Sequence, residues 1–176
     1  LLAYDAVEKT YTKFDNVFIL LAPKNGDIFQ HDVLKLTEEI TTDAWQIPYS
    51  RRVDSLQNFQ HTYAEDDDLI VESLYEESTS LQAEDIKKIK QIGLSDPLLV
   101  KRLVSADGRV TALNITIEFP KVSPDAELRD VVAKTREMVA LYQEKYPTID
   151  IYTTGISLLN NAFVEAGEND LAFLAP

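Results

Sequence analysis

The 176-residue chain contains no cysteine, few glycines and no long apolar run. The absence of cysteine excludes a disulfide framework and a thiolate metal site. The five glycines form neither a glycine-rich phosphate loop nor a nucleophile elbow, and Gly26 and Gly155 stand alone as turn or cap residues. A membrane-spanning helix shows a run of about 18 or more apolar residues. Because no such run occurs, we expect no transmembrane helix within this chain.

Positive charge is also scarce. Lys and Arg total 17 against 30 Asp and Glu, so the formal net charge is −13. A uniformly acidic domain repels phosphate backbones and anionic lipid surfaces, which disfavours nucleic-acid binding. A membrane-adjacent domain poor in Lys and Arg is better placed on the extracytoplasmic side. The apolar content of 45% and the length favour one folded domain with a sizeable core.

Prolines and turn residues divide the chain into short apolar segments that are typical of strands. The run NVFILLAP predicts a strand buried on both faces. In LNITIEF, apolar and polar residues alternate strictly, which predicts a strand with one face on the core and the other toward water. Asp107-Gly108 predicts a two-residue hairpin turn with positive φ between two apolar strands. The predicted strands are Asn16–Pro23, Arg51–Gln60, Asp67–Tyr75, Leu113–Phe119 and Ile149–Thr153.

Four segments carry apolar residues at helical spacing. One runs from Asp32 to Pro48, and a short one follows near residue 86 with Gly93 as a C-terminal cap. The helix Asp125–Tyr146 has Ser123 as its N-cap, and the last helix is Ile156–Ala166. The predicted buried positions are Val33, Leu36, Thr37, Ile40 and Ala44 in the first helix, Ile86 and Ile89 in the second, and Leu128, Val131, Val132, Thr135, Val139, Tyr142 and Tyr146 in the third; the fourth carries Ile156, Leu159, Phe163 and Val164.

The order of these elements is strand–helix–strand, an insertion, and again strand–helix–strand. Each half can form a right-handed crossover unit, which predicts an α+β, ferredoxin-like split βαβ sheet with helices on one face. The segment between the halves is an inserted strand and helix region, and the last helix is a C-terminal addition. We expect 17–22, 113–119 and 149–153 to be neighbouring strands.

Residues of chemical interest are few and scattered. His31 and His61 have no fixed partner spacing and are interpreted as structural or exposed, since a zinc site needs three or four ligands. The acidic stretch Ala64–Asp68 lacks the alternating pattern and the glycine of a calcium loop, which favours a solvated turn. Asn114 begins an NIT sequence, which matches a glycosylation acceptor and arises equally well by chance. Trp45 is assigned to core packing, with an exposed interaction face as the alternative.

No pair of carboxylates suggests general acid–base catalysis, since Glu38, Glu39, Glu76 and Glu77 are typical of helix and loop surfaces. We therefore predict no catalytic residue, no bound metal and no cofactor, and the protein is predicted not to be an enzyme. Substrate-binding residues are not identifiable from the sequence.

Several segments, in order, resemble one family. They are NVFILLAPKNGDIF, VLKLTEEI, IPYSRRVDSLQNF, DDDLIVESL, SDPLLVKRLVSADGRVTALNITI and TTGISLLNNAFVEAGENDLAFLAP. Together they cover nearly the whole chain and are similar to the extracytoplasmic loop of resistance–nodulation–division superfamily exporters. Within that superfamily the segments resemble most the hydrophobe-exporter branch, whose best-known members are the large mycobacterial membrane proteins.

This resemblance implies that residues 1–176 are a single porter domain between the first and second membrane helices of a larger inner-membrane protein. The apolar ends, Leu1–Asp5 and Leu171–Pro176, are then expected to adjoin those helices. The implied fold is a porter subdomain on the periplasmic side, and the implied function is proton-driven export of hydrophobic or amphiphilic compounds such as lipids and drugs. The domain would form part of the substrate pathway or a partner-docking surface. The expected partners are the membrane-embedded remainder of the same polypeptide, the substrate and accessory exporter proteins, with no nucleic acid.

Two other hypotheses compete with the exporter. A membrane-tethered sensor or accessory domain would bind lipid or protein without transport. An enzyme on a ferredoxin-like scaffold is the third, because this fold hosts many functions. The lack of a convergent catalytic set disfavours the enzyme, whereas the number of membrane helices in the parent protein would separate the first two.

Overall fold

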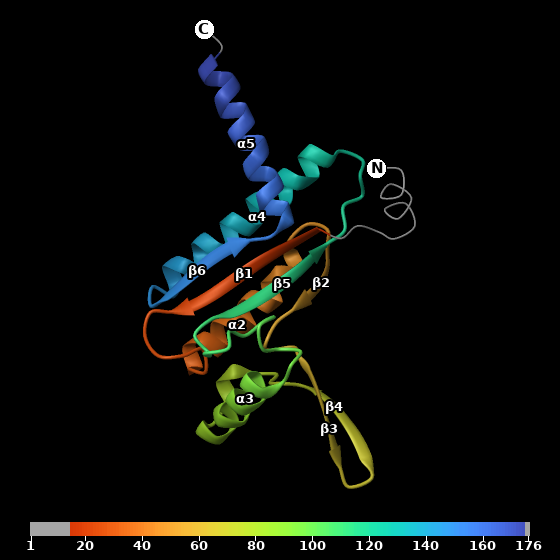
Figure 1. The fold of residues 1–176 in the computed structure, drawn as a ribbon, viewed down its shortest axis with the longest axis vertical. Coiled ribbons are helices and arrows are strands. Elements are labelled where there is room, and N and C mark those ends of the chain that lie inside the picture. Colours follow the sequence, from red (N-terminus) through yellow and green to blue (C-terminus); the bar gives the residue numbers. More distant parts are fainter. Residues whose placement is uncertain (1–14, 175–176) are drawn as a thin grey trace.

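A four-stranded antiparallel sheet lies at the centre of the computed structural model, which describes residues 15–174. The strand order is β2-β5-β1-β6 (Figure 1). Helix α2 (His31–Asp43) connects β1 to β2, and helix α4 (Pro124–Lys145) connects β5 to β6. Both helices pack on the same face of the sheet, so the fold is α+β with the ferredoxin-like split βαβ arrangement. The strands are β1 (Asp15–Pro23), β2 (Ser50–Asp54), β5 (Thr111–Ile117) and β6 (Ile149–Thr154).

The predicted neighbours are confirmed, because β1 pairs with β5 on one side and with β6 on the other. Period-two alternation sends Leu113, Ile115 and Ile117 of β5 into the core, where each is fully buried. Phe119 lies beyond the end of the strand and is half-buried against Tyr49. The stripe predicted for α2 is also buried, up to Ala44 in the 3-10 helix η1 (Ala44–Gln46).

Strand β1 differs from its prediction as a strand buried on both faces. Val17, Ile19 and Leu21 face the helices and are fully buried, whereas Phe18 and Leu20 on the opposite face are half-exposed. The reason is that α2 and α4 cover only one face of the sheet, so the second apolar row of β1 lies on a face that no helix of residues 15–174 covers, which we call the helix-free face. This face provides the candidate site described below.

An insertion of about 55 residues between β2 and β5 forms a separate part of the molecule. The predicted strand Arg51–Gln60 is wrong as a single element: β2 ends at Asp54, a turn follows, and β3 (Gln60–Glu65) begins a hairpin with β4 (Asp68–Ser73). Among the described strands these two pair only with each other, and they project from the sheet, below it in Figure 1. The 3-10 helix η2 (Ser78–Ser80) and helix α3 (Ala83–Ser95) complete the insertion.

Two glycine predictions need correction. Gly93 lies inside α3 and is buried against the Phe29 ring, 3.0 Å from an ideal Cβ, so it permits close packing and is not the C-terminal cap. In the turn at Asp107-Gly108, only Gly108 has a positive φ, of 68°. The Ser105 amide donates to the Val110 carbonyl at 2.9 Å, which closes a four-residue loop. The segment before this loop is not a regular strand, since only Val104 bridges to β5.

Helix α4 matches the predicted helix, but its first turn is capped differently. Ser123 occupies the N-cap without a capping bond from its side chain. The buried Glu127 carboxylate instead accepts backbone N–H bonds from Lys121, Val122 and Ser123 at 2.8–3.0 Å. Of the predicted stripe, Val131, Val132, Thr135 and Tyr142 are buried, Leu128, Val139 and Tyr146 are half-buried, and the buried Met138 and Glu127 were not predicted.

Helix α5 (Ile156–Leu174) is longer than its predicted range, and of the four apolar residues predicted in it only Val164 is half-buried. Its polar residues Ser157 and Asn161 are buried, whereas Ile156, Leu159 and Phe163 are 43%, 57% and 69% exposed. Ion pairs hold it on α4: Arg136 binds both Glu165 oxygens at 2.7 and 3.0 Å, and Arg129 contacts Glu168 at 3.0 Å. The side chains of the predicted membrane-proximal segment Leu171–Pro176, and the whole of Leu1–Asp5, lie outside the described residues.

The start of β1 and the start of α5 meet at one end of the sheet. The Ile156 amide donates to the Asn16 side-chain oxygen at 3.1 Å. Gly155, with φ of +117°, allows this approach, because a Cβ there would lie 2.5 Å from the Asn16 carbonyl oxygen. From this point α5 extends away from the sheet (Figure 1).

Candidate functional site

A pocket of about 570 Å³ lies on the helix-free face of the sheet, and we call it the open-face pocket. Strands, the β2–β3 turn and the loop before β5 all contribute to it. Its lining residues are Phe18, Arg52, Asp54, Phe59, Leu98, Lys101, Arg102, Leu103 and Asn114.

The floor of the pocket is set by strand register. Phe18 of β1 lies opposite Asn114 of β5, and Asn114 lies opposite Asp54 of β2. Residues directly opposite one another in a sheet share a face, so all three side chains point away from α2 and α4. The Asn16 side-chain amide donates to Asn114 Oδ1 at 3.1 Å, which orients the Asn114 amide across the floor.

The first wall is the loop between α3 and β5. Leu99 and Val104 are buried in the core and anchor it, and the Ala112 amide donates to the Leu103 carbonyl at 2.7 Å. Asp96 caps the turn by accepting the Leu98 amide at 2.8 Å. With Leu99 and Val104 held in the core, their neighbours Leu98 and Leu103 line the pocket, and Leu98 is 57% exposed.

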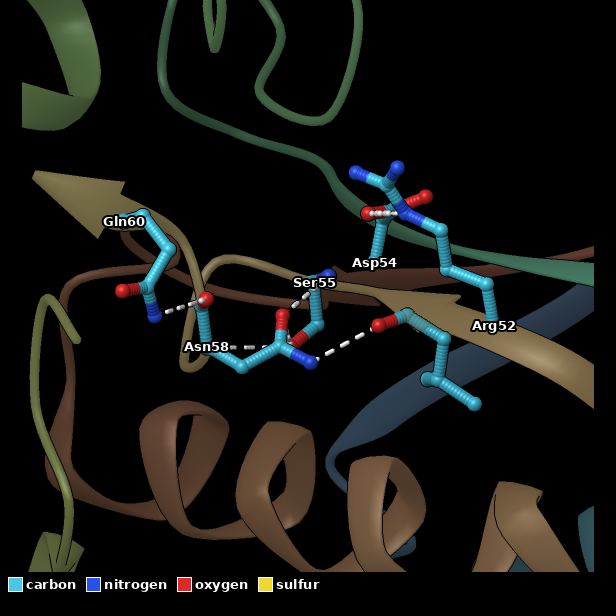
Figure 2. Close-up of polar contacts among 6 residues, drawn as sticks. Arg52, Asp54, Ser55, Asn58 and Gln60 are labelled. Atoms are coloured by element: carbon cyan, nitrogen blue, oxygen red, sulfur yellow. Dashed lines mark hydrogen bonds and ion pairs between the residues drawn. The ribbon is translucent and has the colours of Figure 1, made fainter.

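The second wall is the turn after β2, which Figure 2 shows in detail. The Asn58 side chain closes this turn: its Oδ1 accepts the Ser55 amide at 2.9 Å, and its Nδ2 donates to the Val53 carbonyl at 2.8 Å. Buried Ser55 is tied to α2 through Thr41, whose hydroxyl donates to Ser55 Oγ at 2.9 Å. This anchored turn places Phe59 and Asp54 at the edge of the pocket.

Three cationic side chains and one carboxylate surround this apolar lining. Arg52 Nε contacts Asp54 Oδ1 at 2.7 Å, so this pair is neutral overall (Figure 2). Lys101 and Arg102 are exposed on the loop, and neither forms an ion pair with another residue of the described part of the chain. The arrangement can hold an apolar group on the floor and contact a polar group at the rim.

A second hollow of about 410 Å³ separates the β3–β4 hairpin from α3. Its lining is strongly acidic, with Glu72, Glu76, Glu77 and Asp85 opposed only by Lys88 and His61. The hairpin that forms one side of it pairs with no other strand in the described region. A two-stranded hairpin is marginally stable alone, so the walls of this hollow are held less firmly than those of the open-face pocket.

The histidines and the acidic stretch noted in the sequence do not form a site. His31 is exposed at the start of α2, and His61 lies on β3 with its ring stacked on Tyr63 at 5.5 Å. Ala64–Asp68 spans the exposed turn of the hairpin, where Asp66 has a φ of 52°. Within residues 15–174, no three His, Asp or Glu side chains are grouped so that they could hold a metal ion.

The other residues noted in the sequence, one tryptophan and four glutamates, lie outside the open-face pocket. Trp45 lies in η1 and is 50% exposed, so its assignment to core packing is wrong; the 3-10 turn buries Ala44 and leaves the indole at the surface. Glu38 accepts a hydrogen bond from the Ser78 amide at 2.8 Å, and Glu39 binds Lys145 at 2.8 Å. Both glutamates therefore link α2 to other elements of the fold. Glu76 and Glu77 are exposed.

The sequence identified none of the pocket residues as such; Asn114, which lines the floor within β5, was noted only as the start of the NIT match. A signal was present, because Lys101-Arg102 interrupts an apolar stretch, LLVKRLV, in a chain with few basic residues. A scan against protein-family models found no match to this chain, and a search of curated proteins found no significant match.

Proposed function

We propose that this domain binds hydrophobic or amphiphilic small molecules in the open-face pocket, and that it is the extracytoplasmic porter domain of a proton-driven exporter of such compounds. The observation that carries the proposal is the pocket itself. Phe18, Phe59, Leu98 and Leu103 give it an apolar lining on an anchored frame. Its volume of about 570 Å³ lies within the roughly 300–1,000 Å³ common for small-molecule sites.

The topology supports the placement in a larger membrane protein. Asp15, the first described residue, and the start of α5 lie at the same end of the sheet. A domain inserted between two successive membrane helices needs such a geometry, because both connections return to one bilayer. The exposed apolar side chains of α5, Leu159 and Phe163, also suit a helix with further partners.

In this proposal the domain works by binding and not by catalysis. No helix in the described part of the chain is long and apolar enough to span a bilayer. Proton coupling requires ionisable groups within the membrane, so that step is assigned to the membrane-embedded remainder of the polypeptide. The runner-up is a membrane-tethered sensor that uses the same pocket without transport.

Binding is tested with the neutral fluorescent probe N-phenyl-1-naphthylamine. We expect saturable enhancement of its fluorescence with the wild-type domain. Binding should be at least about fivefold weaker in Leu98→Glu, since a bound apolar ligand would remove water from the introduced carboxylate. The matched control is Leu69→Glu, because Leu69 is 72% exposed on β4 and does not line the open-face pocket. Unchanged binding in both variants, or equal loss in both, contradicts the assignment of the pocket.

Transport is tested in the complete parent protein. About a dozen membrane helices and a second domain of this type indicate an exporter, whereas one or two helices indicate the tethered sensor. In cells carrying the exporter, Leu98→Glu should raise probe accumulation relative to Leu69→Glu at equal expression. Equal accumulation in the two variants removes the pocket from the transport pathway.

A further inference from the structure

The charge of the open-face pocket is opposite to that of the whole chain. The chain carries a net charge of −13, yet the pocket lining holds Arg52, Lys101 and Arg102 against Asp54 alone. Because Arg52 and Asp54 contact each other, the excess of two positive charges belongs to Lys101 and Arg102. A local excess of this kind on an acidic background attracts an anion to one place and repels it elsewhere.

The backbone holds these two residues at the rim. Lys101 has a φ of 63°, a left-handed conformation that is unfavourable for a residue with a Cβ. Its amide donates to the Val104 carbonyl at 2.7 Å, and the Arg102 amide donates to the Leu99 carbonyl at 3.1 Å. Since Leu99 and Val104 are buried in the core, the strained turn presents Lys101 and Arg102 to the pocket.

We infer that the open-face pocket selects amphiphiles with an anionic head group, such as an alkyl phosphate or a fatty acid carboxylate. The head group contacts Lys101 and Arg102, and the hydrocarbon lies on Phe18, Phe59 and Leu98. The inference rests on the proposed function, since it names the substrate class of the same pocket. Lys and Arg both bind such oxyanions through charge-assisted hydrogen bonds.

The expected gain in affinity for an anionic head group is modest because Lys101 and Arg102 are exposed at the rim. A solvent-exposed ion pair contributes about 0.2–1 kcal/mol, which converts to roughly 1.4- to 5-fold in affinity for each cation. Together Lys101 and Arg102 should favour an anionic head over a neutral one by about two- to thirtyfold at low salt. The preference should shrink as salt rises, since screening acts on exposed charges.

The test compares ten-carbon ligands below their micellar concentrations by calorimetry. Decyl phosphate and decanoate are the anionic probes, 1-decanol is neutral, decyltrimethylammonium is cationic, and inorganic phosphate has a head without a tail. We expect both anionic probes to bind most tightly, decanol more weakly, and inorganic phosphate with no measurable heat. In Lys101→Gln/Arg102→Gln, the anionic advantage should disappear while decanol binding stays within about twofold.

The control is Lys87→Gln/Arg109→Gln, which removes the same charge from exposed residues outside the pocket lining. This variant should keep the anionic preference. Three results overturn the inference and leave the proposed function standing: equal binding of decanol and the anions, tighter binding of the cationic probe, or equal loss in both double variants. Inorganic phosphate binding as tightly as decyl phosphate also overturns it. No binding of any alkyl probe, or binding unaffected by Leu98→Glu, rejects the proposed function itself.

Discussion

Gly155 joins β6 to α5 and allows the helix to start directly against the beginning of β1. An ideal Cβ at this position would lie 2.5 Å from the Asn16 carbonyl oxygen and 3.1 Å from the Phe18 amide nitrogen. Both contacts are with backbone inside a paired strand, so neither neighbour can move away cheaply. The φ of +117° adds a strain that any residue with a Cβ would feel.

We predict that Gly155→Ala destabilises the domain by about 3 kcal/mol or more. The strained backbone accounts for ~1–3 kcal/mol, and displacement of α5 from β1 adds to it through the lost bond from the Ile156 amide to Asn16. For a chain of this size, 3 kcal/mol lowers the melting temperature by roughly 6–12 °C.

The assay is urea unfolding followed by circular dichroism, with Gly167→Ala as the matched control. Gly167 lies in the same helix, and apart from the local helix backbone no described atom lies within 4 Å of its ideal Cβ. Alanine there should stabilise the domain by about 0.5–1 kcal/mol, because glycine is a poor residue in a helix interior. The two variants should therefore change the free energy of unfolding in opposite directions. A Gly155→Ala protein as stable as wild type would falsify the close approach of α5 to β1.

Three further predictions concern α4 and its contacts. Val132→Ala should cost ~1–3 kcal/mol in urea unfolding, since Val132 is only 1% exposed; a change within error removes it from the core. Arg136, and then Asn161, hold the pKa of the Glu165 carboxyl at about 2. A lowered folded-state pKa contributes stability that is fully present above the ordinary carboxyl pKa near 4.5 and is lost as pH falls toward 2. The unfolding free energies of wild type and Glu165→Gln should therefore converge near that pH. A normal Glu165 pKa by NMR titration contradicts the ion pair. The pKa of Glu127 is also lowered, chiefly by the hydrogen bond that it accepts from the Ser123 N–H. We expect Glu127→Gln to be less stable than wild type at neutral pH and the difference in unfolding free energy to narrow in acid. A difference that does not depend on pH refutes this.

The chain sequence determined the existence, type and order of most elements. The alternation in LNITIEF and the helical spacing from Pro124 to Lys145 are local patterns, and burial on one face imposes each of them directly. Given two strand–helix–strand units, short right-handed crossovers leave few topologies, and the split βαβ sheet is one of them.

Only the tertiary structure decided the features that depend on residues far apart in the chain. From the sequence alone Gly93 fits a helix cap, but the fold packs the Phe29 ring on it inside α3. Leu159 and Phe163 of α5 fit a core face, yet they are exposed, whereas Ser157 and Asn161 of the same helix are buried. The open-face pocket has the same origin. Strand register and an anchored loop bring Phe18 near Lys101, more than 80 residues away, and no local pattern records such a long-range contact.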